Sequence, residues 1–201
     1  MSGEKASLLI LASKSASRRA MLDAAGVCYQ SIPAAIDERA VEAGLAGADP
    51  GDIAAALSVA KATAVAARHP GALVLGSDSL VVAGGRRFDK PRSAEEAGEH
   101  LRFFSGKVMD LHSAAVLVKD GGCQWSHASI ARLHVRALSD EFIAHYLGLE
   151  WPAIQATVGA FRIEGLGVQL FDHIEGDQFT VLGMPLLPLL GALREQRVLI
   201  A

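Results

Sequence analysis

The chain has 201 residues, of which 51% are hydrophobic and 20% are charged, and its formal net charge at pH 7 is −3. These values favour one globular domain, or one domain with two lobes, and exclude an intrinsically disordered chain. The pI of about 6.2 argues against a dedicated nucleic-acid-binding protein, because such proteins are usually basic overall. A local basic loop that binds phosphate remains compatible with this balance.

Cysteine content and hydropathy indicate the compartment. Only two cysteines occur, Cys28 and Cys123, so we expect no disulfide framework and a reducing environment. The longest uncharged stretch, residues 178–193, contains two prolines and two glycines and falls short of the ~20 apolar residues that a spanning helix needs. The N-terminal apolar run is too short for a secretory signal. We therefore expect a soluble cytoplasmic protein with no membrane partner and no nucleic-acid partner.

The chain begins with a pattern typical of a strand followed by a helix. Residues 8–12 are apolar and predict a short buried strand. Ser15 or Ser17 can cap a helix that runs to about Ala25, and Gly26 can end it.

A second strand and two helices are expected next. Residues 27–33 are typical of a strand, and the acidic stretch "AIDERAVEAG" at 35–44 is a loop that enters a short helix. Asp49 can cap the following alanine-rich helix, with Pro50 at its first position, and residues 70–72 break it.

An apolar strand occupies the middle of the chain. It is predicted over residues 72–83, and the glycines and arginines at 84–87 turn the chain back. Ser93 and Glu96 have the spacing of a capping box, which opens a helix to about Phe104.

The second half of the chain predicts a long hairpin followed by further helices. Residues 105–138 form two strands around the turn "KDGG", and Ser139 starts a helix over 140–148. A strand is expected at 167–174, and a last helix ends near Glu195. Helices and strands alternate around a hairpin, so the pattern predicts an α/β fold with a mixed sheet.

The stretch "LLILASKSASRR" at residues 8–19 has the character of an anion site. Free backbone N–H groups at a helix N-terminus favour phosphate, and serine hydroxyls add donors. Arg18 and Arg19 can add charge-assisted, bidentate hydrogen bonds. The alternative is that the serines only cap the helix and that both arginines are solvated.

Asp78 stands in the middle of the apolar strand "LVLGSDSLVV". An unpaired charge there is costly, so the carboxylate needs a partner, a metal or a bend into a cleft, which Gly76 could permit. The alternative is a structural aspartate bonded to nearby backbone N–H groups.

Further charged residues are weaker candidates when each is taken alone. Asp37 and Glu38 could hold a hard cation such as Mg²⁺ through oxygen ligands. Lys61 on the alanine-rich helix could simply face solvent, and Lys90, which precedes a proline, could be a turn residue.

Common nucleotide and zinc motifs are missing from the sequence. "FFSGK" at 103–107 ends in Gly-Lys, but residue 101 is leucine where a P-loop needs glycine, and no G-x-G-x-x-G follows a strand. The seven histidines form no H-E-x-x-H motif and do not pair with cysteine at zinc spacing, so no structural zinc site is expected.

Seven segments, taken in order, resemble the Maf family of nucleoside triphosphate pyrophosphatases. They are "LASKSASR" with Arg19, Asp37–Glu38, "LSVAKA" with Lys61, "GSDS" with Asp78, "DKP" with Lys90, "FSGK", and "GDQFTVLGMP" near the C-terminus. The matches span residues 8 to 193.

The resemblance implies a Maf/ITPase-like α/β fold: an elongated mixed β-sheet flanked by helices, with two lobes and a central cleft, in a single domain over residues 1–201. It implies cleavage of a nucleoside triphosphate to the monophosphate and pyrophosphate with a divalent metal, Mg²⁺ or Mn²⁺. The catalytic and metal-binding residues that it implies are Asp78 as general base and metal ligand, Lys61, Lys90, and Glu38 as metal ligand. The substrate-binding residues are Ser13, Ser15, Arg18 and Arg19.

The base preference follows no single family pattern. Relatives that prefer thymidine or uridine triphosphate tend to carry Arg, Thr and Gln at three positions, and those that prefer 7-methyl-GTP tend to carry Trp, Gln and Glu. This chain has Ser17, Ser79 and Glu164, so Glu164 and "EGLG" lean toward the second set. The small Ser17 could leave room for a bulkier or modified base.

Three other functions compete with the enzyme. A non-catalytic, nucleotide-binding regulator of cell division would bind without releasing pyrophosphate. A nucleic-acid binder would show steep salt dependence, but 5% aromatic content disfavours it. A different phosphohydrolase would release orthophosphate. The hairpin at 107–136 and the apolar tail could support a homodimer or could equally be core.

Overall fold

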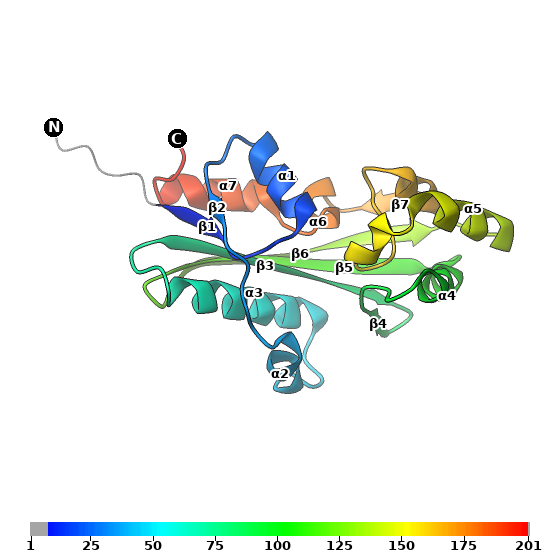
Figure 1. Cartoon of the computed structure of the whole chain (residues 1–201), viewed down its shortest axis with the longest axis horizontal. Coiled ribbons are helices and arrows are strands. Elements are labelled where there is room, and N and C mark those ends of the chain that lie inside the picture. The colour runs from blue at the N-terminus through cyan, green and yellow to red at the C-terminus, as the bar shows by residue number, and fades with distance from the viewer. Residues whose placement is uncertain (1–7, 201) are drawn as a thin grey trace.

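The computed structural model describes residues 8–200 and contains one seven-stranded mixed sheet (Figure 1). The strands, in chain order, are β1 (Leu9–Leu11), β2 (Gln30–Ser31), β3 (Leu73–Ala83), β4 (Arg86–Phe88), β5 (Val108–Lys119), β6 (Gly122–Val135) and β7 (Phe171–Glu175). The strand order is β2-β1-β3-β5-β6-β7, and β4 pairs with β3. β1 is parallel to both β2 and β3, while the other pairs are antiparallel, which confirms the mixed sheet.

Helices cover the sheet on both faces (Figure 1). They are α1 (Ala16–Ala24), α2 (Glu38–Ala43), α3 (Pro50–Ala66), α4 (Ala94–Phe104), α5 (Asp140–Glu150), the 3₁₀ turns η1 (Ala153–Ala156) and η2 (Leu166–Leu170), α6 (Gln178–Val181) and α7 (Leu186–Glu195). Their predicted starts are confirmed, because Ser15, Asp49, Ser93 and Ser139 each accept a backbone hydrogen bond as N-cap. Within residues 8–200, no helix is both long enough and apolar enough to cross a bilayer.

The β5–β6 hairpin is the longest pairing in the sheet and forms where the turn signal predicts. Asp120 and Gly121 adopt left-handed φ values of 49° and 79° at its tip. Glycine and aspartate tolerate this conformation, which matches the right-handed twist of the flanking strands. The register that the hairpin sets runs from Val108 opposite His134 to Lys119 opposite Gly122.

Strand pairing along one edge of β3 is interrupted, and the candidate site lies at this interruption. β1 pairs with residues 73–75 of β3, and β4 pairs with residues 81–83. Between them, residues 76–80 have β5 on one side but no strand on the other. Asp78 lies at the centre of this gap in the strand ladder.

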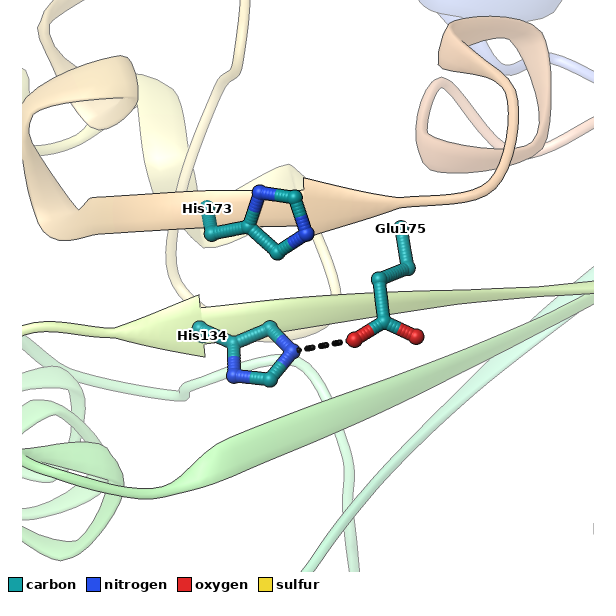
Figure 2. A group of neighbouring side chains, drawn as sticks. All are labelled: His134, His173 and Glu175. Atoms are coloured by element: carbon teal, nitrogen blue, oxygen red, sulfur yellow. Dashed lines mark hydrogen bonds and ion pairs between the residues drawn. The ribbon is translucent and has the colours of Figure 1, made fainter.

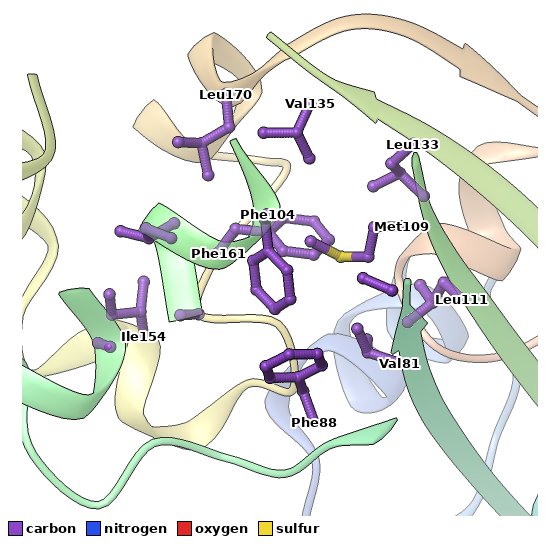
Figure 3. Packing of buried hydrophobic residues seen from close by; sticks show 14 of the residues in the cluster. Val81, Phe88, Phe104, Met109, Leu111, Leu133, Val135, Ile154, Phe161 and Leu170 are labelled. Atoms are coloured by element: carbon purple, nitrogen blue, oxygen red, sulfur yellow. The ribbon is translucent and has the colours of Figure 1, made fainter. Parts of the chain in front are cut away.

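Buried apolar side chains gather at both ends of the sheet. One cluster, which includes Phe104, Met109 and Phe161, packs α4 and α5 against the end of the sheet near β4 (Figure 3). At the other end, α1 and α7 pack on one face through residues such as Leu189, and α3 packs on the opposite face through residues such as Val65.

Two predicted strands were too long. The strand expected at 27–33 is limited to β2, since β2 pairs only with the three-residue β1 and Pro33 cannot donate a ladder hydrogen bond. The strand expected at 167–174 begins only at Phe171. Residues 166–170, just before β7, form the 3₁₀ turn η2 instead. In this turn Gly167 lies so close to the Arg162 backbone that a Cβ atom on residue 167 would be 2.5 Å from the Arg162 carbonyl oxygen.

Candidate active site

Two carboxylates meet one ammonium group at the gap in the β3 edge. The Lys61 Nζ atom lies 2.9 Å from Asp78 Oδ1 and 3.0 Å from Glu38 Oε1. The Asp78 and Lys61 side chains are 13% and 11% exposed, whereas Glu38 is 50% exposed. Asp78 is therefore paired, as its position in an apolar strand requires, and it is still in contact with solvent.

A glycine in β3 brings the lysine to this carboxylate. A Cβ atom on Gly76 would lie 2.0 Å from the Ser58 carbonyl oxygen and 3.0 Å from the Ala62 Cβ atom. Only a glycine allows the α3 backbone to approach β3 so closely, and Lys61 is on the turn of α3 that makes this approach. Gly76 thus permits close helix–strand packing.

Arg18 is buried and is held from several sides. Its Nε donates to the Gly183 carbonyl oxygen at 2.9 Å, and Nη1 donates to the Ser77 carbonyl oxygen at 2.7 Å and to Ser13 Oγ at 3.3 Å. Nη2 donates to Ser79 Oγ at 3.1 Å and lies 4.0 Å from Asp78 Oδ1. Because most of its N–H groups are directed at protein acceptors, Arg18 fastens α1 and β3 to the C-terminal segment.

Arg18 carries a buried positive charge next to carboxylates. Burial lowers the pKa of Arg18 from its ordinary value, while the negative charges of Asp78 and Glu38 oppose that shift. An arginine remains protonated under all ordinary conditions. It therefore supplies a fixed positive charge behind Asp78.

The Gly183 carbonyl is an acceptor that sequence reasoning missed. Besides Arg18, the hydroxyls of Ser77 and Ser79 donate to it, at 3.2 Å and 3.0 Å. Ser113 on β5 adds a hydrogen bond to the Thr180 carbonyl oxygen at 2.9 Å. Gly183 lies in the "GDQFTVLGMP" segment, which the sequence analysis had already singled out. That segment could point to the region, but a residue pattern cannot show that a main-chain oxygen is the acceptor.

The serines at the start of α1 have separate structural roles. Ser15 is the N-cap, and its side chain accepts from the Arg18 backbone N–H. Ser13 Oγ accepts from the Ser15 backbone N–H at 3.2 Å and from Arg18. Ser17 is half-buried in the first turn of the helix. The structure thus selects Ser15 over Ser17 as the cap.

Arg19 points away from Arg18. It is exposed and lines a shallow hollow on the outer side of α1, together with Asp23 and Tyr29. Successive helical residues differ by about 100° in direction, so neighbouring arginines cannot both face the β3 edge. The structure brings Arg18 to the carboxylate cluster and leaves Arg19 on the outer surface.

Lys90 belongs to the same electrostatic cluster. Its side chain is exposed, but the surrounding protein desolvates the ammonium group enough to lower its pKa. The positive charges of Arg18 and Lys61 lower the pKa further, and the negative charges of Asp78 and Glu38 oppose them. Lys90 thus adds a third cation to the surroundings of Asp78.

Glu164 lies apart from this cluster. It is exposed, and within residues 8–200 no hydrogen bond or ion pair joins it to Asp78, Lys61 or Arg18. Its segment is anchored by Glu150, which accepts from Arg162 Nε at 2.8 Å and from the Leu166 backbone N–H at 3.2 Å. The Arg162 hydrogen bond lowers the pKa of Glu150, and the pair holds the residues around Glu164 in place.

The fold and the site together define an α/β protein in which cationic side chains gather around one strand carboxylate, a setting suited to a polyphosphate substrate. The chain belongs to the Maf-like protein family, whose sequence profile matches residues 8–196.

Curated relatives of this family cover nearly the whole chain. A Rhizobium etli protein named 7-methyl-GTP pyrophosphatase is 50% identical over 189 residues, which is 93% of this chain and 95% of the relative. A Rhodopseudomonas palustris protein named nucleoside triphosphate pyrophosphatase is 48% identical over 191 residues, with 95% of each chain covered. Among solved structures, a Neisseria meningitidis lipoprotein, GNA1162, matches 76% of this chain and 99% of its own at 17% identity and a TM-score of 0.28, too low to carry an argument.

Proposed function

We propose that this protein is a nucleoside triphosphate pyrophosphatase that releases the nucleoside monophosphate and pyrophosphate. The observation that carries the proposal is the Asp78 carboxylate, which is 13% exposed at a gap in the sheet and pairs with Lys61. Arg18 and Lys90 add two further cations around it. The names of relatives at 48–50% identity support the same reaction.

Asp78 acts as the general base in this proposal. Its contacts with Lys61 and Arg18 both involve Oδ1, and Oδ2, which takes part in neither, is the oxygen that accepts the proton from water. That water attacks the α-phosphorus, and pyrophosphate leaves. Positioned bases of this kind contribute about 10²–10⁴-fold to a rate.

The surrounding cations bind and stabilise the phosphates. Lys61 and Lys90 neutralise the negative charge that develops on the phosphoryl oxygens, and catalysis of phosphoryl transfer depends mainly on such electrostatic stabilisation and on positioning. Ser13, Ser15 and the backbone N–H groups at the start of α1 have the same role at the helix N-terminus. Arg18 positions Asp78 and supplies background charge, whereas Arg19 lies on the outer side of α1 and is assigned no contact with the phosphates in this proposal.

Glu38 and Asp78 fit a hard divalent cation, Mg²⁺ or Mn²⁺. Both carboxylates already converge on one cationic centre, the Lys61 ammonium, and Glu38 is half-exposed and so accessible from solvent. Mg²⁺ is commonly held by one or two carboxylates and completed by substrate phosphates. When bound, such an ion would shield the charge of the triphosphate.

A modified purine is the base that we propose for the substrate. Ser17 is small and half-buried at the start of α1, so it leaves space beside the helix for a bulky base. The Ser79 hydroxyl donates to the Gly183 carbonyl oxygen and lies 3.0 Å from Ser113 Oγ, so it is fixed from within the protein. Glu164 on its anchored segment is the third residue assigned to specificity. A panel of triphosphates that shows strict preference for unmodified pyrimidines would refute this assignment.

The test of the function is Asp78→Asn, assayed with Mg²⁺ or Mn²⁺ against common and methylated nucleoside triphosphates. The wild type should release pyrophosphate rather than orthophosphate. The variant should keep the wild-type circular dichroism spectrum and lose at least about 100-fold in kcat, because asparagine cannot accept the proton. Full activity in the variant, or orthophosphate as the first product, would contradict the proposal.

A further inference from the structure

A second group of metal-binding side chains lies on the β6–β7 pair, away from Asp78. Within residues 8–200, the ligand atoms of His134, His173 and Glu175 all lie within 4.8 Å of one another (Figure 2). His134 Nε2 is 2.8 Å from Glu175 Oε1, and the two imidazole rings are 5.3 Å apart between centroids.

The strand register explains why these three side chains converge. His134 is directly opposite His173 in the antiparallel β6–β7 ladder, and Glu175 is two residues further along β7. Side chains alternate between the two faces of a strand. Leu133 and Ile174 belong to the apolar cluster at this end of the sheet, so the three polar side chains share the opposite, outward face.

We propose that His134, His173 and Glu175 form a binding site for a divalent transition-metal ion, with Zn²⁺ as the representative ion. Two imidazoles and one carboxylate are a ligand set that suits Zn²⁺, and three protein ligands leave the fourth position to water. Mg²⁺ prefers oxygen ligands and does not compete for this set.

The present separations are close to those that a bound ion needs. Tetrahedral bonds of about 2.1 Å place ligand atoms about 3.4 Å apart. The His134–Glu175 contact is already shorter than this value, and the other separations, all within 4.8 Å, close by rotation of partly exposed side chains. The ion replaces the hydrogen bond between His134 and Glu175 and brings His173 inward.

Neighbouring charges orient the carboxylate without blocking it. Arg132 Nη1 lies 3.9 Å from Glu175 Oε2, and the same guanidinium lies 3.6 Å from Asp110 Oδ1. Arg132 is therefore within ion-pair distance of the far oxygen of Glu175, while Oε1 faces the histidines. A ligand whose second oxygen has a partner is the common arrangement in metal sites.

The site is distinct from the Asp78 cluster. Asp78 is in register with Ala114 on β5, which is opposite Ala128 on β6. His134 is six residues further along β6, a distance of roughly 20 Å at strand spacing. A bound ion would tie β7 to β6 just before α6, the helix that leads to Gly183.

The test is a Zn²⁺ titration of the full-length protein against a chromophoric chelator. The wild type should bind one ion at this site, and His173→Ala and Glu175→Gln should each weaken its binding at least tenfold. The matched control is His145→Ala, which removes an exposed histidine on α5 and should leave binding unchanged. Circular dichroism verifies that all variants are folded.

Two further measurements separate this site from the proposed catalytic one. Co²⁺ in place of Zn²⁺ should give visible absorption bands of a nitrogen-ligated ion, and these bands should persist in Asp78→Asn and disappear in His173→Ala. Millimolar Mg²⁺ should not displace the ion. Equal Zn²⁺ affinity in the wild type and in His173→Ala, or loss of the bands in Asp78→Asn alone, would overturn the proposal.

Discussion

Replacing Gly76 by alanine should disturb the site without touching any charged group. The new Cβ atom would lie 2.0 Å from the Ser58 carbonyl oxygen, whereas ordinary contacts begin at 3.4 Å, so α3 and β3 must separate by about 1.4 Å. Both contacting groups include backbone atoms, and a rotamer change cannot relieve the clash. Overpacking of this kind costs about 3 kcal/mol of unfolding free energy.

The displacement should reach the Lys61–Asp78 pair, to which we assign the chemistry. Lys61 is one helical turn after Ser58, so the shift lengthens its 2.9 Å contact with Asp78. Displacements of about 1 Å at a catalytic group cost about 100-fold in rate, and we expect that loss in kcat/KM for Gly76→Ala.

The assay pairs urea denaturation with pyrophosphate release, and the control is Gly148→Ala. Gly148 is in helix α5, and a Cβ atom there would meet no heavy atom within 4 Å. This control should be as stable as the wild type or up to about 1 kcal/mol more stable, with unchanged kinetics. Wild-type stability and wild-type kcat/KM in Gly76→Ala would refute the argument that the glycine sets the helix–strand distance.

Two pH-dependent predictions follow from individual groups. Desolvation, together with the charges of Arg18 and Lys61, lowers the pKa of Lys90 below the ordinary 10.5. As the pH rises, kcat/KM should therefore begin to fall before pH 10.5, and Lys90→Arg should move this alkaline decrease to higher pH. An alkaline decrease at the same pH in both proteins would contradict a role for the Lys90 charge. Glu150→Gln should lose about 2 kcal/mol of unfolding free energy at pH 7, because it removes a charge-assisted hydrogen bond to Arg162. Since the folded pKa of Glu150 is lowered from 4.5, this stabilisation is complete above 4.5 and disappears as the pH falls through the folded value; denaturation curves at pH 7 and in acid would show whether the two proteins converge.

Local signals in the sequence predicted most of the elements. The hairpin tip at Asp120–Gly121 and the cap residues Ser93 and Ser139 act within a few residues of themselves, so their effect can be seen in the sequence. The strand expected at 167–174 was too long at its start, because residues 166–170 form a 3₁₀ turn in which Gly167 packs closely on the Arg162 backbone. The apolar pattern of this segment does not specify that packing.

The site was predictable in its charged residues but not in their arrangement. Asp78 was identified from one charge in an apolar strand, and its pairing with Lys61 confirms that the charge needed a partner. The different directions of Arg18 and Arg19 depend on how α1 is rotated against the sheet, which the sequence does not specify. The convergence of His134 and His173 depends on strand register across 39 residues, so a search for short zinc motifs could not find it.

The hydrogen bonds to Gly183 have a consequence for the order in which the protein is made. Arg18 is synthesised 165 residues before Gly183, whose carbonyl oxygen fixes its guanidinium. A nascent chain can build the hairpin and the carboxylate strand long before that acceptor exists. Arg18 must therefore wait for Gly183, and a product truncated before residue 183 carries Asp78 and Lys61 without the acceptor that holds Arg18 beside them.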